Sequence, residues 1–302
     1  MQVFVTGASG WIGSASVDEL LAAGHEVTGL ARSDASASSL EKKGVRVLRG
    51  DLDDLDALRR GAEAAEGVVH LANKHDWVHP RESDRAERAA VETLVAAIDG
   101  SDRPFVVASG LAMLAQGRLG TETDPSPAVG PASPRGGTEN LALDHVERGV
   151  RSIAARFAPT VHGTGDHGFI ALIVAAARRR GVSGYVGEGT NAWAAVHRSD
   201  AARLVRLGLE QAPAGTRLHA AAEEAVSTRE IAEAIGAVLD VPVVSVAPED
   251  AVDHFGFIGR FFGLDMSASS ELTRERFDWT PTGPTLLEDI AAGAYAHAGL
   301  DA

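Results

Sequence analysis

Cysteine is absent from the 302 residues, and this excludes disulfide bonds, thiolate nucleophiles and cysteine-based zinc or iron–sulfur sites. Lysine occurs three times and tyrosine twice, so arginine carries nearly all of the positive charge. The longest apolar run, at residues 168–177, is far shorter than the ~20 residues that a membrane-spanning helix needs. No signal peptide is recognised, because the apolar segment at residues 2–5 runs directly into glycines. We therefore expect a soluble, cytoplasmic protein without a membrane partner.

The balance of charge also limits the classes of partner. Acidic residues outnumber basic ones by 42 to 28, which gives a formal net charge of −14. Such an excess argues against nucleic acid as the main partner, because a nucleic-acid surface needs positive charge. The hydrophobic share of 45% is enough for a packed interior in one large domain, or in two that share a core.

Short apolar segments alternate with helical patterns through the first half of the chain. The pattern predicts strands at residues 3–5, 26–30, 45–48, 68–71, 105–108 and 153–157, and helices at 11–23, 55–64, 85–98 and 139–148. Apolar strands joined by helices indicate a parallel sheet that is covered on both faces. Because the crossovers of such a sheet are right-handed, we predict an α/β fold with a Rossmann-like, doubly wound parallel sheet.

The pattern becomes irregular in the last third of the chain. It predicts helices at residues 169–180, 200–209, 228–239 and 286–296, strands at 193–196 and 241–246, and a turn-rich stretch at 184–189. The helix from residue 228 follows a capping box formed by Ser227 and Glu230. We expect a dinucleotide-binding domain at residues 1–165, with parts of 190–225 returning to it, and a smaller α+β substrate lobe at 166–302.

A glycine-rich turn joins the first predicted strand to the first predicted helix. The eight residues 6–13 read Thr-Gly-Ala-Ser-Gly-Trp-Ile-Gly. Glycines permit a tight turn and let the backbone approach a pyrophosphate, which then lies at the positive end of the helix dipole. A glycine triplet alone is weak evidence, but the strand and helix around it favour dinucleotide binding.

This turn and four later segments resemble the extended short-chain dehydrogenase/reductases, of the NAD-dependent epimerase/dehydratase type. The later segments are Gly50-Asp51-Leu52, His70-Leu71-Ala72-Asn73, Arg156 to Gly163, and Ala195 to Asp200. The resemblance implies a nicotinamide dinucleotide cofactor. The cofactor-binding residues expected from the motifs are Gly7, Ser9, Gly10, Trp11, Ile12, Gly13, Arg32, Ser33, Asp51, Leu52, Leu71, Ala72, Asn73, Ser109, Pro159 and Val161.

The end of the second predicted strand bears on the choice between NADP and NAD. An NAD site usually has a carboxylate there, which accepts a hydrogen bond from the ribose 2′-hydroxyl. Here Arg32 and Ser33 follow the strand, and a guanidinium suits a 2′-phosphate. We therefore favour NADP. In the alternative, Arg32 is an ordinary loop arginine, Asp34 supplies the carboxylate and the cofactor is NAD.

The catalytic residues depart from the family's pattern. The family uses a Tyr-x-x-x-Lys pair with a nearby serine, in which the tyrosine exchanges a proton with the substrate oxygen. Neither Tyr185 nor Tyr295 is followed by lysine four residues later. The sequence therefore resembles atypical members, which keep the cofactor motif and lose the usual catalytic residues.

Two alignments of the catalytic helix stay open. One places Arg135 at the tyrosine position and Glu139 at the lysine position. The other places Pro131 at the tyrosine position and Arg135 at the lysine position, with Glu139 as a neighbouring helix acid. The serine aligns with Ser109 or, one residue later, with Gly110. The catalytic candidates are accordingly Ser109, Arg135, Glu139 and His162.

Two of these candidates could titrate in a useful range. His162 would border the nicotinamide, although a structural, hydrogen-bonded histidine fits the pattern as well. Glu139 would donate a proton if burial raised its pKa, and otherwise it is an ordinary helix glutamate. By resemblance, Tyr185, Asp166 and His167 would line the substrate lobe. His75 and His79 have the spacing of a zinc motif, but Pro80 and the loop context argue against one, and we expect no metal.

Two functions follow from these observations. The first is an NADP(H)-dependent oxidoreductase, epimerase or dehydratase that acts on a small hydroxylated or carbonyl metabolite, with unusual catalytic residues. The second is a non-catalytic NADP-binding redox sensor, which the missing tyrosine–lysine pair favours. The resemblance also implies a homodimer.

Overall fold

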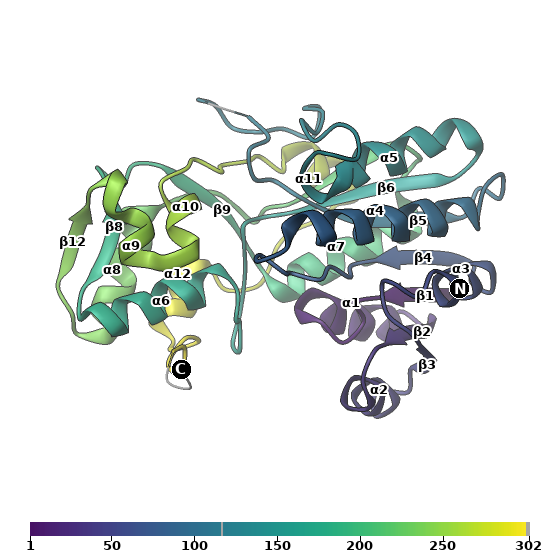
Figure 1. Ribbon diagram of the computed structural model, residues 1–302, viewed down its shortest axis with the longest axis horizontal. Helices are drawn as coiled ribbons and strands as arrows, with labels where there is room; N and C mark the ends of the chain where they lie inside the picture. Colours follow the sequence, from purple (N-terminus) through teal and green to yellow (C-terminus); the bar gives the residue numbers. More distant parts are fainter. Residues whose placement is uncertain (116, 300–302) are drawn as a thin grey trace.

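The computed structural model describes residues 1–115 and 117–299, and in this part of the chain seven parallel strands form a central sheet (Figure 1). In sheet order the strands are β10 (Thr216–Ala220), β6 (Arg151–Phe157), β5 (Pro104–Gly110), β4 (Gly67–His70), β1 (Gln2–Thr6), β2 (Glu26–Ala31) and β3 (Arg46–Arg49). Every neighbouring pair in this sheet is parallel. The prediction of a Rossmann-like, doubly wound sheet is confirmed.

Helices cover both faces of the sheet because successive side chains of a strand point to opposite faces. Val3 and Val5 of β1 belong to one apolar cluster, whereas Phe4 between them belongs to another. The first cluster contains residues of α1 (Trp11–Ala22), α2 (Asp34–Glu41) and α7 (Arg198–Gln211). The second contains residues of α3 (Leu55–Glu63), α4 (Pro80–Ala96) and α5 (Thr138–Asp144). Ligand-binding loops therefore lie at the carboxyl edge of the strands.

A smaller part with its own apolar core lies beyond one end of the sheet (Figure 1). Its strands are β7 (Thr160–His162), β9 (Ala192–His197) and β11 (Glu223–Ser227) in one sheet, and β8 (Ser183–Val186) and β12 (Val243–Val246) in another. Its helices are α6 (Phe169–Arg180), α8 (Thr228–Leu239), α9 (Ala251–Phe255), α10 (Gly259–Phe262) and α12 (Leu286–Ala291). Helix α11 (Glu271–Phe277) packs on the main part instead, where Thr273 accepts a hydrogen bond from the His219 backbone of β10 and Phe277 joins the first apolar cluster. The described residues also form four short 3₁₀ turns: η1 (Pro134–Gly137), η2 (His145–Arg148), η3 (Pro248–Asp250) and η4 (Gly256–Ile258).

Several element predictions need correction. The stretch at 184–189 is only partly a turn, because Ser183–Val186 pairs in parallel with β12. Helix α4 begins at Pro80 rather than at residue 85, since proline is favoured in the first helical turn. Helix α2, which the apolar pattern does not reveal, begins with a capping box between Ser33 and Ser36. None of the described helices is long and apolar enough to cross a membrane.

A buried histidine ties two central strands together below the glycine turn. Thr6 of β1 and His70 of β4 are register partners, and Thr6 Oγ1 lies 2.8 Å from His70 Nδ1. The His70 side chain has no exposed surface. Burial, with a smaller contribution from the positive charge of Arg135, lowers the pKa of His70 to about 3. The folded protein therefore holds this ring neutral.

This burial makes stability depend on pH. Below its ordinary pKa of 6.5, His70 binds a proton in the unfolded chain but stays neutral in the folded one down to about pH 3. The free energy of unfolding should therefore decrease as the pH is lowered, and this residue should contribute about 2 kcal/mol of that decrease between pH 6.5 and pH 5. Urea titrations at several pH values should show a flatter dependence in His70→Gln than in wild type. The exposed His297→Gln is the control, and equal slopes in all three proteins would contradict the prediction.

Candidate functional site

The glycine turn is packed so closely that two of its glycines, Gly7 and Gly13, leave no room for a Cβ atom. Gly7 has φ +68°, and a Cβ there would lie 2.7 Å from the backbone nitrogen of Ala72. A Cβ on Gly13 would lie 2.0 Å from the Gly7 carbonyl oxygen. Gly10 is exposed and its Cβ would meet the same oxygen at 3.1 Å. Helix α1 begins here without a side-chain cap, so its first N–H groups can face an anion. These residues fit the pyrophosphate of a dinucleotide.

Trp11 connects this turn to the segment that follows β6. Its indole Nε1 donates a hydrogen bond of 2.7 Å to the Val161 carbonyl oxygen. The Arg198 guanidinium lies 4.3 Å from the centre of the indole ring. The sequence-predicted residues Trp11 and Val161 therefore meet in space although 150 positions separate them.

The residues beyond β2 form a second group at the same edge of the sheet. Arg32 is exposed, and Ser33 caps α2. Arg49, at the end of the neighbouring β3, donates hydrogen bonds to the Ser33 carbonyl oxygen at 2.7 Å and to Asp34 Oδ1 at 2.5 Å. The carboxylate that would favour NAD is thus paired with an arginine.

The remaining cofactor candidates lie in the loops after β3 and β4. Asp51 Oδ1 accepts hydrogen bonds from the backbone N–H groups of residues 53 and 54, and Leu52 is buried. Asn73 donates a hydrogen bond of 2.6 Å to the buried Glu87 and accepts one from the His75 backbone. These contacts shape the loops that surround the turn.

Ser109 and Glu139 meet at the end of β5. Ser109 Oγ donates a hydrogen bond of 2.6 Å to Glu139 Oε2. Glu139 in turn receives the guanidinium of Arg156, which has no exposed surface, at 2.5 Å from Nη2. The hydroxyl hydrogen of Ser109 is therefore committed, and its lone pairs are left to accept a hydrogen bond.

Of the two interpretations of Glu139, the one in which burial raises its pKa and makes it a proton donor is wrong. Burial alone would raise this pKa, but the hydrogen bonds and charge of Arg156 lower it, and Ser109 and Arg217 lower it further. The pKa of Glu139 therefore lies below its ordinary value. Glu139 is a carboxylate, which accepts hydrogen bonds and has no proton to donate. Arg156 is the sequence feature that could have indicated this ion pair, because a buried arginine in a strand requires a carboxylate partner.

Arg135 pairs with a different acid. Its Nε donates to Glu87 Oε1 at 2.9 Å, its Nη2 contacts the same oxygen, and Glu87 is almost fully buried. Three successive residues, Arg135, Gly136 and Gly137, have positive φ values of 55°, 61° and 64°. This left-handed segment precedes α5 and turns the Arg135 side chain toward α4, so Arg135 and Glu139 lie in separate ion pairs although four positions separate them.

His162 is fully buried in β7. Its Nδ1 lies 2.6 Å from Asp289 Oδ2 of α12, and its ring meets that of His197 at 5.6 Å in a T-shaped arrangement. Burial lowers the pKa of His162, although the Asp289 hydrogen bond and charge act in the opposite direction. This geometry is that of a structural, hydrogen-bonded histidine. A catalytic role for His162 stays a prediction.

The two tyrosines lie in the smaller part. Tyr295 donates a hydrogen bond of 2.8 Å to Asp166, and burial raises the pKa of Tyr295 well above its usual range. The ring of Tyr185 lies 4.7 Å below the guanidinium of Arg229. The two histidines with zinc-like spacing do not converge on one another: Nδ1 of His79 contacts Asp76, three residues before it.

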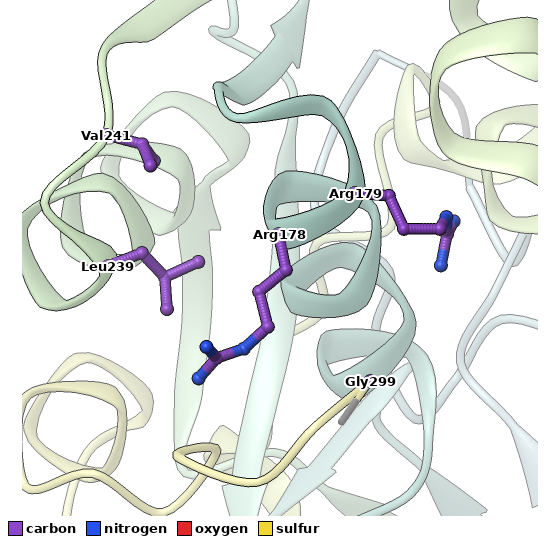
Figure 2. A pocket seen from close by; sticks show the side chains of 5 residues that line it. All are labelled: Arg178, Arg179, Leu239, Val241 and Gly299. Carbon is purple, nitrogen blue, oxygen red and sulfur yellow. The ribbon is translucent and has the colours of Figure 1, made fainter. Parts of the chain in front are cut away.

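A pocket of about 350 Å³ lies in the smaller part, at the carboxyl end of α6 (Figure 2). It is lined by Arg178, Arg179, Leu239, Val241 and Gly299. Figure 2 shows Arg178 extending between Leu239 and Gly299, whereas Arg179 points away from them. None of these lining residues belongs to the strands or turns of the candidate cofactor site.

Comparisons with known proteins agree with this geometry. The sequence model of the NAD dependent epimerase/dehydratase family matches residues 3–221. An uncharacterized protein of Schizosaccharomyces pombe is 44% identical over 98% of this chain and the whole of its own length. A ketoreductase of Stigmatella aurantiaca, acting on a farnesyl-substituted dihydroquinoline-1-oxide, is 26% identical over 71% of this chain and 66% of its own. The structure of MoeE5 with UDP-glucose and NAD has a TM-score of 0.75 and 25% identity, covering 99% of this chain and 100% of MoeE5.

The packing of the turn predicts different outcomes for two of its glycines. Gly10→Val places a side chain on the exposed face of the turn and should weaken NADPH binding at least ~10-fold while leaving the fold intact. Gly13→Ala, whose Cβ would overlap the Gly7 carbonyl, should lower the melting temperature instead. Fluorescence titration with NADPH and thermal unfolding measure the two effects. Undiminished NADPH binding by Gly10→Val would contradict the assignment of the turn.

Proposed function

The chain belongs to the NAD-dependent epimerase/dehydratase family, and on that basis we propose that it is an NADP(H)-dependent oxidoreductase acting on a small hydroxylated or carbonyl metabolite. The observation that carries the proposal is the glycine turn, in which Gly7 and Gly13 admit no Cβ and helix α1 begins uncapped. Gly7, Ser9, Gly10 and the residues to Gly13 would hold the pyrophosphate. The bound nicotinamide would supply or accept hydride at its C4 position.

The preference for NADP rests on two arginines. Arg32 is exposed beside the capped end of α2, where a 2′-phosphate would lie, and Arg49 occupies the neighbouring carboxylate of Asp34. A guanidinium and a phosphate form paired, charge-assisted hydrogen bonds. Because Asp34 is already paired through Oδ1 with Arg49, a ribose 2′-hydroxyl would have to share this carboxylate with a guanidinium, which disfavours NAD.

The substrate would meet a serine hydroxyl that accepts a hydrogen bond rather than donating one. Because Ser109 gives its hydrogen to Glu139, its oxygen would hold a substrate hydroxyl by accepting a hydrogen bond. Arg135, which keeps its charge at any working pH, would act as a fixed positive charge near the developing oxyanion. Neither group releases a proton readily, so an ordered water or His162 would complete the proton transfer. The ketoreductase activity of the Stigmatella relative agrees with hydride transfer to a carbonyl.

One observation favours the second function, a redox sensor that binds NADP without turnover. Each catalytic candidate is held by a partner: Ser109 by Glu139, Arg135 by Glu87, and His162 by Asp289. Absorbance at 340 nm separates the two functions. An enzyme consumes NADPH with at least one member of a carbonyl panel, whereas a sensor binds NADPH and consumes none.

Removing the guanidinium at residue 32 tests the cofactor preference. Arg32→Ala should weaken NADPH binding by about 1.5–3 kcal/mol, as expected for a charge-assisted contact, and leave NADH binding almost unchanged. Titration calorimetry with both cofactors measures the difference. Arg46→Ala is the matched control, since Arg46 is an exposed arginine of β3 that pairs with Glu26. Equal losses for NADPH and NADH in Arg32→Ala would mean that Arg32 does not contact the 2′-phosphate.

Tyrosine substitution tests the unusual chemistry. Tyr185→Phe and Tyr295→Phe should each slow single-turnover hydride transfer less than ~10-fold, whereas the loss of a general acid costs 10²–10⁴-fold. Ser109→Ala is the comparator and should slow the step about 100-fold or more, because it removes the acceptor for the substrate hydroxyl. A thousand-fold loss in Tyr185→Phe would show instead that a tyrosine from the smaller part performs the proton transfer.

A further inference from the structure

Aromatic side chains connect the loop after β4 of the main sheet to the smaller part of the molecule. Trp77 lies in the loop between β4 and α4, at the carboxyl edge of the main sheet. Its ring centre is 4.8 Å from that of Phe257 in η4 of the smaller part. Trp77 remains 51% exposed, which is unusual for so large an apolar side chain. The contact therefore joins the loop after β4 to η4 of the smaller part and leaves much of the indole accessible.

The series of rings continues along the smaller part. Phe257 meets Phe261 at 5.3 Å, and Phe261 is stacked on Phe169 at 6.2 Å with an angle of 8° between the rings. Phe169 opens helix α6, two residues after His167. His167 meets the indole of Trp11 edge-on at 5.9 Å, and Trp11 belongs to the glycine turn. Two sets of ring contacts, Trp11 with His167 and Phe169 through to Trp77, are thus joined by the two-residue step along the chain from His167 to Phe169.

His75 lies next to Trp77, the last ring of the series. Its ring lies 6.2 Å from that of Trp77. Partial burial lowers the pKa of His75, and the positive charge of Arg135 lowers it further. We call the side chains of Trp11, His167, Phe169, Phe261, Phe257 and Trp77 the aromatic border.

We propose that the aromatic border binds an aromatic or flat apolar portion of the substrate, so that the oxidoreductase acts on aryl-bearing ketones and alcohols rather than on sugar nucleotides. This inference rests on the proposed function and names its substrate class. The half-exposed indole of Trp77, with the partly buried rings beside it, can bind a planar apolar group by offset stacking and edge contacts, whereas a sugar requires several directed hydrogen-bonding groups. Of the polar groups at the sheet edge, Ser109 accepts a hydrogen bond and suits the hydroxyl of the alcohol form, whereas the guanidinium of Arg135 suits the carbonyl oxygen of the ketone form.

Three probes of different chemistry test the inference: 4-phenylbutan-2-one, its counterpart butan-2-one without the ring, and UDP-glucose. Saturation-transfer NMR and titration give their dissociation constants, with and without NADPH. The aryl ketone should bind about 10-fold more tightly than butan-2-one, and UDP-glucose should bind most weakly. Trp77→Ala and Phe257→Ala should abolish the advantage of the aryl ketone, whereas Trp77→Phe should preserve most of it. Val252→Ala, an exposed apolar residue of α9 outside the border, is the control.

The outcomes separate this inference from the proposed function. Equal dissociation constants for the two ketones, tighter binding of UDP-glucose, or no effect of Trp77→Ala would each overturn the role of the border. If Trp77→Ala changes only the association state in size-exclusion chromatography, the border is a protein contact and the inference is wrong. Failure of the wild type to bind NADPH contradicts the proposed function alone, because the titrations without cofactor still measure the ring preference.

Discussion

The candidate site is organised around one guanidinium that has no contact with solvent. Arg156, near the carboxyl end of β6, binds Glu139 of α5, the carbonyl oxygen of Asp124 and the ring of His219 in β10. Removing the partner of such a buried charge costs roughly 3–5 kcal/mol, so Glu139 is held in place by the stability of the fold. Glu139 then holds the Ser109 hydroxyl. A structural ion pair thereby determines which hydrogen-bonding group the site offers to a substrate.

This arrangement differs in kind from a tyrosine–lysine pair. In that pair a positive charge lowers the pKa of a hydroxyl so that it exchanges a proton near neutral pH. Here the carboxylate of Glu139 stands beside the hydroxyl of Ser109, and a negative charge makes that hydroxyl harder to ionise. The four-residue spacing of Arg135 and Glu139 is retained in the sequence, but the left-handed segment at 135–137 separates the two side chains. Arg135 and Glu139 therefore have the spacing of the tyrosine–lysine pair, but their side chains do not act together.

The sequence predicted the features that depend on local pattern. Six of the seven strands of the main sheet and most of its helices follow from apolar periodicity, and the glycine turn follows from its place between strand and helix. Strand β10 (Thr216–Ala220) was not predicted. The ionisation of the site could not be predicted in this way. The pKa of Glu139 depends on Arg156, and the state of His162 depends on Asp289, 127 residues away. Strand β8 was missed because its residues include a glycine and pair with a partner 60 positions distant.

Trp11 belongs both to the glycine turn and to the aromatic border. Its indole nitrogen fixes the glycine turn to Val161, and its ring edge meets His167, the first member of the aromatic border on the smaller part. A dinucleotide bound at the turn would therefore lie close to a side chain that also belongs to the aromatic border. In an enzyme this contact would help to align the nicotinamide with its substrate, and in a sensor it would transmit cofactor occupancy. The two functions require the same packing, and they differ only in whether a proton donor reaches the oxygen that Ser109 holds.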